Sequence, residues 1–378
     1  MKVLDRYLLA QCVPSLGLAL VVLTFVMVTH RLFMLSDLVV ARGVPLVVVL
    51  QLLGLALPAL LPLLVPVSLL VALLLTMGRL SLDHEAVAMR SSGVSLAQNL
   101  RPVMVLSTVL VVATAAVSLW GQPASARAFQ RVLYESVKNR IGLTTQTGVF
   151  TEIARGVTAY AGEVRDGGKE LGDLFLYLEK GPGGGVWILA RSGRMWDEGG
   201  RLALDLRDGE MHQGGGPGQP YRRLRFRHYL LRVPLPARAV STDVEGMGSG
   251  RLAALARTGD RGARYELHRR LALPAICWVF GVLGVCLGLH HSRFGRGRGL
   301  TLGLVTILVY YALLTAGKAL GKRSPVPPEA AAWLPDLALA LLALYAFARK
   351  NREAPLPLEE AAAAALTRAV GLLRRIRP

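Results

Sequence analysis

The sequence contains few charged residues and very little cysteine. Charged residues make up only 18% of its 378 residues, whereas a typical soluble domain has about 25%. Hydrophobic residues make up 53%, and the mean hydropathy is +0.44, which excludes an ordinary soluble protein. All three cysteines, Cys12, Cys277 and Cys286, fall in apolar runs, so the sequence holds no disulfide framework.

The apolar runs predict six transmembrane helices, because each is long enough to cross a hydrocarbon core of about 30 Å as an α-helix. The first run is longer than the apolar region of a signal peptide and no small-residue cleavage site follows it, so we expect it to stay in the membrane. The predicted spans are Leu8–Thr29, Leu52–Gly78, Val103–Leu119, Leu271–Leu289, Leu300–Ala319 and Ala331–Ala348.

Between the third and fourth spans the sequence becomes polar and rich in glycine, with alternating apolar positions. This pattern predicts an antiparallel all-β domain, a sandwich or a jelly roll. Its predicted strands are Phe150–Arg155, Leu174–Glu179, Val186–Arg191, Leu202–Arg207 and Tyr221–Val233. We therefore divide the chain into spans one to three (1–125), the β domain (126–262), spans four to six (263–350) and a C-terminal tail (351–378).

Basic residues in the short loops predict the orientation of the spans. With six spans they all fall on the cytoplasmic side, together with both termini, and the β domain lies on the opposite side. The tail ends in arginines and is typical of an amphipathic helix on an anionic leaflet. The basic residues are Lys2, Arg6, Arg79, Arg90, Arg101, Arg293, Arg296, Arg298, Arg349, Lys350, Arg352, Arg374, Arg375 and Arg377.

A second set of cations, at the outer ends of the spans, is not explained by the orientation rule. Arginine forks and lysine ammonium groups bind phosphate, so this set indicates an anionic ligand such as a lipid head group. Ordinary snorkelling and surface solvation are the alternative. The set comprises Arg31, Arg42, Arg127, Arg131, Arg264, Arg269, Arg270, Lys318, Lys322 and Arg323, within a net charge of +19.

Pro58, Pro62 and Pro66 lie on one face of the second span, because they follow one another at intervals of four residues. Each proline removes a backbone hydrogen bond. In a bilayer this is tolerated where other helices or a water-lined cavity satisfy the freed carbonyls. The face is therefore either the flexible wall of a lipid cavity or a kinked packing surface.

The segment Ser81–Ser95 lies between two very apolar runs and predicts a short cytoplasmic helix within 81–97. Ser81 is suited to cap it, two acids suit the positive end of the helix dipole, and Gly93 is suited to end it. A small apolar strip including Val87 and Met89 favours docking on a cytoplasmic partner; a helix lying on lipid is the alternative. The residues of this site are Asp83, Glu85, Ala86, Met89, Arg90 and Gly93.

Two apparent catalytic motifs fail on inspection. His84-Glu85 begins like a zinc-protease motif, but Ala88 stands where the second histidine ligand is required. Gly317–Arg323 is one residue short of a phosphate-binding loop and lacks the final serine or threonine. We therefore expect no catalytic site, metal or cofactor in this chain, and no nucleic-acid partner.

Several segments together resemble the lipopolysaccharide export permease family, LptF/LptG, over essentially the whole chain. They are Leu60–Leu80 with its Pro-x-Ser run, the E-x-x-x-M-x-x-x-G-x-S pattern of Glu85–Ser95, Trp120–Pro123, Arg264–Arg270 and Trp333–Arg349. Arg31 and Lys318 favour the LptF-like branch.

This resemblance implies a permease subunit that pairs with a paralogous permease as a heterodimer. A dimeric cytoplasmic ABC ATPase would drive it, contacting Glu85 of the loop helix. Lipopolysaccharide would leave the outer leaflet of the inner membrane and pass to periplasmic β-jelly-roll proteins, including a membrane-anchored bridge component. Arg31 and Lys318 would bind lipid phosphate, with Lys322 and Arg323 as weaker candidates. The tail is longer than the family pattern, and a second ATPase contact there is an alternative to the membrane surface.

Two other classes of function stay open at this stage. A membrane scaffold that only anchors the β domain would not need the cations at the outer ends of the spans. A membrane-bound hydrolase would need paired intramembrane acids or metal ligands, and Asp336 is the one acid placed inside a late span.

Overall fold

The computed structural model describes residues 3–40, 45–144, 147–154, 156–165, 170–179, 185–198, 201–213, 221–234, 244–289, 298–323 and 326–352. Arg42, the loop cations Arg293 and Arg296, and the tail beyond Arg352 lie outside these residues. So does Lys2. The predictions that concern them therefore remain predictions.

Six helices in the described part of the chain are long and apolar enough to cross a membrane, as predicted. Five of them are single α-helices. The remaining one, the third span, begins as α4, passes through a π turn at Val117–Gly121 and continues as α5. The helices are α1 (Val3–Val40), α2 (Leu46–Leu82), α4 (Leu96–Ala116), α5 (Gln122–Thr144), α8 (Arg261–Gly288), α9 (Arg298–Arg323) and α10 (Pro328–Asn351).

The helices extend beyond the predicted spans, because hydropathy reports only the part that crosses hydrocarbon. Polar residues beyond an apolar run can stay helical when a local signal supports them. At α8, for example, Asp260 caps the helix by accepting a hydrogen bond from the backbone N–H of Ala263 at 2.7 Å. The helix therefore starts ten residues before the apolar run that begins at Leu271.

The chain forms two compact units. The first comprises 1–30, 57–125 and 247–378, and the second comprises 31–56 and 126–246. The β domain therefore ends near residue 246 and not at the predicted 262. The correction has a physical reason: α7 (Ser249–Arg257) belongs with the membrane helices, where its Leu252 and Ala256 are buried.

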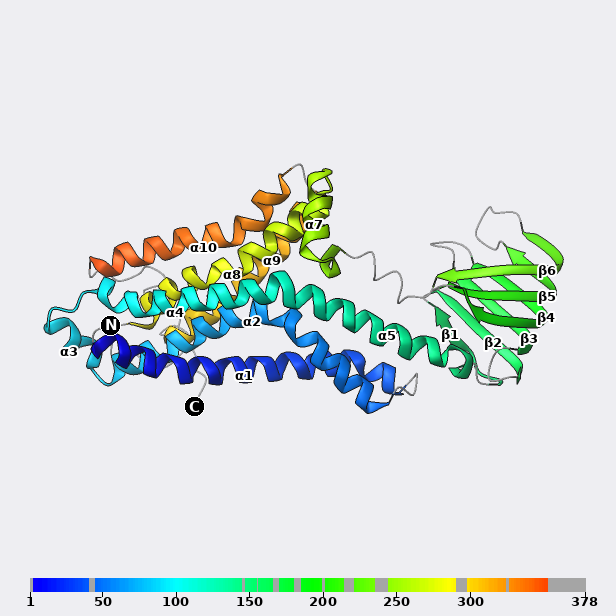
Figure 1. The fold of residues 1–378 in the computed structure, drawn as a ribbon, viewed down its shortest axis with the longest axis horizontal. Coiled ribbons are helices and arrows are strands. Elements are labelled where there is room, and N and C mark those ends of the chain that lie inside the picture. Colours follow the sequence, from blue (N-terminus) through cyan, green and yellow to red (C-terminus); the bar gives the residue numbers. More distant parts are fainter. Residues whose placement is uncertain are drawn as a thin grey trace, which may run out of the picture. The chain divides into compact units, whose positions relative to one another are not determined.

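Glycines let α8 approach its neighbours closely inside the first unit, where α4, α8 and α10 lie side by side (Figure 1). A Cβ atom added at Gly284 would lie 2.6 Å from the Cβ of Leu73, and one at Gly288 would lie 2.6 Å from the Cβ of Met77. Small residues serve this purpose at helix contacts in membranes. The Gly284 and Gly288 spacing thus serves packing of α8 against α2 within the chain.

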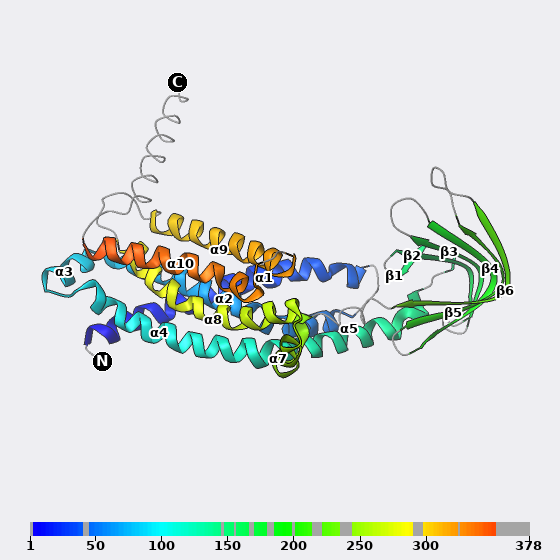
Figure 2. The same cartoon turned by 90° about the horizontal axis from the view of Figure 1, so that it is seen from above.

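In its described residues the β domain is a curved antiparallel sheet whose six strands follow one another in chain order (Figure 2). It confirms the predicted all-β insert. The described strands contain no Greek-key crossing, so the jelly-roll-like description narrows to an up-and-down sheet. The strands are β1 (Thr151–Ala154), β2 (Val157–Arg165), β3 (Glu170–Glu179), β4 (Gly185–Asp197), β5 (Arg201–Gln213) and β6 (Arg222–Pro234).

A transverse crease crosses this sheet at one level. Regular pairing between neighbouring strands is interrupted there from β2 to β6. Asp173 and Asp208 adopt left-handed backbone with φ of 48°. On each side of the crease the buried positions alternate, but across it they are three residues apart, as between Leu171 and Leu174. The crease thus bends the sheet while one face stays apolar. Its residues are Gly162, Asp173, Arg191, Asp208 and Arg227.

Candidate coupling helix and ligand-binding sites

The helix predicted within 81–97 is present but is shorter than that range. It is α3, Glu85–Ser91, seven residues long, between the end of α2 and the start of α4 (Figure 1). Ser81 does not cap it, because α2 continues to Leu82 and the Ser81 hydroxyl donates to the Met77 carbonyl at 2.9 Å inside that helix. The residue before α3 is His84, which has φ of 58° and no side-chain capping bond.

Gly93 ends α3 as predicted. Its φ is +82°, a left-handed conformation that glycine adopts without a steric penalty. Its N–H donates to the Arg90 carbonyl at 2.9 Å, and the N–H of Val94 donates to the Met89 carbonyl at 3.0 Å. These two bonds form a Schellman motif, which satisfies the last carbonyls of the helix.

The helix α3 has one exposed face and one half-buried face. Val87 and Ala88 are exposed, together with Ser91 and Ser92. Ala86 packs against an apolar cluster built mainly from α1, α2, α4 and α8. The predicted apolar strip is therefore divided, because Val87 points to solvent whereas Met89 is half-buried with Glu85, Ala86 and Arg90.

Polar contacts attach the half-buried face to the first and last spans. The Tyr7 hydroxyl of α1 donates to Glu85 Oε2 at 2.7 Å, and Arg90 Nη2 donates to the Lys350 carbonyl of α10 at 3.4 Å. Before α3, Asp83 pairs with Arg79 at 3.5 Å. Sequence reasoning missed Tyr7 and Lys350, since each lies far along the chain from its partner and no local pattern joins them.

The cations predicted at the outer ends of the spans include both exposed and buried side chains. Arg31 on α1 and Lys318 on α9 are exposed. Arg31 belongs to the second compact unit and Lys318 to the first. Arg42 lies outside the described residues. The backbone of Lys322 and Arg323 belongs to α9, but their side chains lie outside the described part of the structure.

Arg264, Arg269 and Arg270 are used by the fold, which corrects their assignment to ligand binding. Arg270 is fully buried and donates to Glu266 Oε1 at 3.1 Å. Arg269 donates to both oxygens of Glu266, at 2.8 and 2.9 Å. Arg264 donates to the Ala256 carbonyl at 3.0 Å. A buried cation requires such pairing, and Glu266, one turn before Arg270, was the signal in the sequence.

The same network reaches the π turn of the third span. Arg270 Nη1 donates to the Ser249 hydroxyl at 3.2 Å, and that hydroxyl donates to the Leu119 carbonyl at 2.5 Å. Because a π turn disturbs the regular helical bonding, its carbonyls need partners from outside the helix. Ser249, at the start of α7, provides one and joins this helix to the third span.

The proline face of α2 lies mostly inside the protein. Pro58 is half-buried, whereas Pro62 and Pro66 are buried. The helix stays continuous from Leu46 to Leu82 through all three. Their position agrees with the packing interpretation of this face, and a role as a cavity wall stays a prediction.

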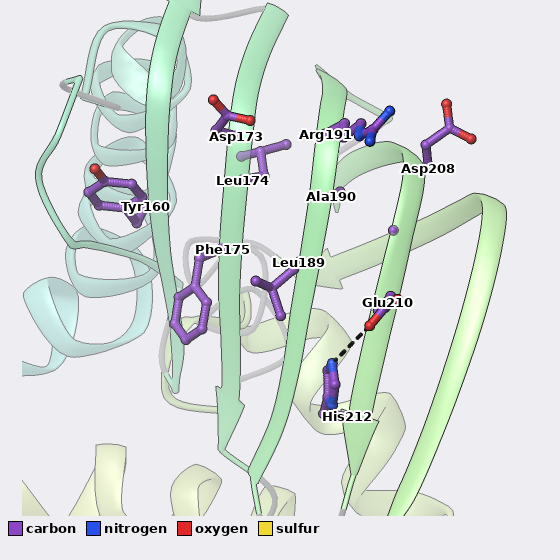
Figure 3. A pocket seen from close by; sticks show the side chains of 11 residues that line it. Tyr160, Asp173, Leu174, Phe175, Leu189, Ala190, Arg191, Asp208, Glu210 and His212 are labelled. Atoms are coloured by element: carbon purple, nitrogen blue, oxygen red, sulfur yellow. Dashed lines mark ion pairs between the residues drawn. The ribbon is translucent and has the colours of Figure 1, made fainter.

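A hollow of about 520 Å³ opens on the outward face of the β sheet, opposite its apolar core (Figure 3). Tyr160, Phe175 and Leu189 line one part of it, and charged and polar residues lie among further apolar ones in the rest. Sequence analysis did not predict this hollow, because its residues are spread over four strands. The charged and polar lining residues are Asp173, Arg191, Asp208, Glu210 and His212.

Glu210 is the most heavily paired acid of this hollow. It accepts hydrogen bonds from Arg223 at 2.8 Å and from Arg225 at 2.7 Å. These bonds, that from Arg223 first, hold the pKa of Glu210 below its usual range. His212 lies 3.6 Å from the same carboxylate (Figure 3).

Comparison with known proteins gives a consistent result. The family model described as lipopolysaccharide export system permease LptF/LptG matches residues 6–349. Lipopolysaccharide export system permease protein LptF of Escherichia coli K12 is 25% identical over 345 residues, covering 90% of this chain and 93% of the relative. The LptF protein of Shigella flexneri matches with the same identity and coverage. This chain is a multi-pass inner-membrane protein and belongs to the LptF/LptG family of lipopolysaccharide export system permeases.

Proposed function

We propose that this chain is the permease subunit of an ABC-type exporter that extracts lipopolysaccharide from the outer leaflet of the inner membrane. A separate dimeric cytoplasmic ATPase supplies the energy. The lipid then passes first to the β domain of this chain and from there to a periplasmic bridge of β-jelly-roll proteins. Membership of the LptF/LptG family supports this proposal, as does the division of the chain into a set of membrane helices and a β sheet.

The observation that carries the proposal is that the membrane helices hold one face of α3 while its other face is exposed. Its half-buried face is fixed to the membrane helices through Ala86, Glu85 and Arg90. Its other face, with Val87 and Ala88, is exposed. A short helix held in this way can dock in a groove on a partner and pass the partner's movement to the spans. We assign Glu85 at its first turn as the acid that contacts the ATPase, with Met89 and Gly93 supporting the helix.

A paralogous permease is the proposed membrane partner, forming a heterodimer with this chain. In the most apolar 18-residue stretch of each helix, the buried share is only 11% for α1 and 22% for α9, whereas it is 72% for α8. Apolar helix faces that are not covered within the chain contact lipid or another membrane protein. The lipid cavity would then lie between the two permeases, with the proline face of α2 as part of its wall.

The lipid phosphates are assigned to Arg31 and Lys318, with Arg42, Lys322 and Arg323 as further candidates. Guanidinium and ammonium groups both suit phosphate oxygens. In the orientation predicted from the basic loop residues, α3, both termini and the basic tail 351–378 are cytoplasmic, whereas the β domain is periplasmic. The tail would lie on the anionic inner leaflet.

Substitution of Glu85 tests the assignment of the coupling helix. We expect Glu85→Arg to abolish co-purification of the ATPase while the chain still inserts in the membrane. Glu179→Ala, an exposed acid of the β domain, serves as the control and should behave like wild type. If Glu85→Arg binds the ATPase and exports lipid normally, the coupling assignment is wrong.

Charge reversal at Arg31 and Lys318 separates a lipid exporter from a scaffold. We expect the pair Arg31→Glu and Lys318→Glu to reduce crosslinking of lipopolysaccharide to the chain and to block growth. Unchanged crosslinking and growth would favour a protein that only anchors the β domain. Mass spectrometry of lipid bound to the complex identifies the cargo.

A further inference from the structure

The hydrogen bond between Tyr7 and Glu85 joins two segments that are 78 residues apart in sequence. Tyr7 lies in the second turn of α1, and Glu85 is the first residue of α3. Both belong to the same compact unit. The bond is 2.7 Å long and is charge-assisted, since a carboxylate accepts it.

The position of α3 depends on such contacts. A helix of seven residues is too short to be stable by itself, because helix nucleation is costly. His84 gives α3 no side-chain capping bond. Besides the Schellman motif at Gly93, the contacts that hold α3 are those of its half-buried face. Ala86 joins the apolar cluster that also includes Leu4 of α1 and Phe347 of α10.

The spans that α3 contacts differ in how firmly they are held. The most apolar stretch of α2 is 67% buried and that of α10, whose Lys350 carbonyl accepts from Arg90, is 39% buried, whereas that of α1 is 11% buried. A segment with few buried apolar contacts moves at a lower free-energy cost. Of these three helices, α1 is therefore the one that displacement of α3 can move most easily, and the Tyr7–Glu85 bond is the polar connection between α3 and α1. Figures 1 and 2 both show the N-terminal end of α1 on the same side as α3.

We propose that Tyr7 is a positioning residue that locks the coupling helix to α1, so that displacement of α3 by the ATPase moves the first span. This inference rests on the proposed function. Tyr7 occupies Glu85 Oε2. A carboxylate accepts several hydrogen bonds, so Oε1 can accept one from a cation of the ATPase at the same time. Glu85 then contacts the partner and transmits its movement.

Tyr7→Phe tests this role, because it removes the donated hydrogen bond and keeps the ring. The matched control is Tyr311→Phe on α9, where the side chain is 60% exposed. The complex with its ATPase is reconstituted in proteoliposomes, and lipopolysaccharide released per ATP hydrolysed is measured. We expect Tyr7→Phe to bind the ATPase as wild type does but to release at least about threefold less lipid per ATP, a size typical of coupling between contacting residues.

A double-mutant cycle with Glu85→Gln distinguishes transmission from a general structural effect. If Tyr7 acts through Glu85, the double variant releases no less lipid per ATP than the worse single variant. Additive losses, or a Tyr7→Phe variant that releases lipid like Tyr311→Phe, would overturn the inference and leave the proposed function intact. Loss of ATPase binding by Tyr7→Phe would also overturn it. A Glu85→Arg variant that binds the ATPase and couples normally would refute the assignment of Glu85 in the proposed function, on which this inference rests.

Discussion

The buried Glu266–Arg270 pair offers the sharpest test of how charge is used in the membrane unit. The side chain of Arg270 is 0% exposed and that of Glu266 is 3% exposed. Glu266→Gln keeps the shape of the side chain but leaves two arginines without their counter-charge. Breaking a buried pair from one side costs about 3–5 kcal/mol. For a unit of this size, that loss corresponds to a fall in melting temperature on the order of 10 °C.

Thermal unfolding of the purified chain in detergent, followed by tryptophan fluorescence, measures this loss. The matched control is Glu163→Gln, which breaks the exposed Arg165–Glu163 pair and should leave the melting temperature nearly unchanged, since exposed pairs contribute little. Equal melting temperatures for the two variants would refute the assignment of Glu266 as an essential buried counter-ion. Replacing Glu266 and Arg270 together by methionine should restore most of the stability, because the fully buried charge of Arg270 is removed with its partner and the side chain of Arg269, which remains, is 23% exposed.

Three further predictions concern packing, backbone and pH. Gly284→Ala should destabilise the chain by about 1–3 kcal/mol in the same unfolding assay, because its Cβ would lie 2.6 Å from a carbon atom of α2; Gly78→Ala, with nothing within 4 Å, is the control. Gly93→Ala should lower ATPase co-purification, since the left-handed backbone at φ of +82° costs an alanine about 1–2 kcal/mol. The lowered pKa of Glu210, caused first by Arg223, stabilises the β domain at neutral pH; this stability is lost as pH falls through the folded-state pKa. Tryptophan fluorescence at decreasing pH should therefore show an acid transition that is shallower in Glu210→Gln.

The spans and the β insert could be predicted because both follow from the hydropathy pattern of neighbouring residues in the sequence. It missed β2 because Val157–Arg165 contains alanine and glycine at positions where strands usually carry branched side chains. It placed the start of α3 too early because α2 extends four residues beyond Gly78. Hydropathy falls at Gly78, but the backbone hydrogen bonds of the helix do not stop there.

The candidate sites were harder to predict, because a charge in a sequence does not show whether it is buried. Arg31 and Arg270 look alike in the sequence, and both follow from the same reasoning about cations at the ends of spans. In the structure Arg31 is exposed, whereas Arg270 is buried against Glu266. The i, i+4 spacing of Glu266 and Arg270 could have indicated that Arg270 is paired within its own helix. No local pattern predicts the Tyr7–Glu85 bond.

Once the buried arginines are removed from the proposed ligand set, the cations that remain lie on spans that are suited to move. Arg31 and Lys318, the described cations assigned to lipid phosphate, lie on α1 and α9, two of the least buried spans of the described chain. The helix α1 also carries Tyr7, which holds α3. The well-buried helices α2 and α8 are suited to stay fixed, because moving them would expose packed apolar surface. If the proposed function is right, we therefore expect the ATP-driven step to act on α1 at the end that carries Tyr7 and to reach the lipid through Arg31 on the same helix.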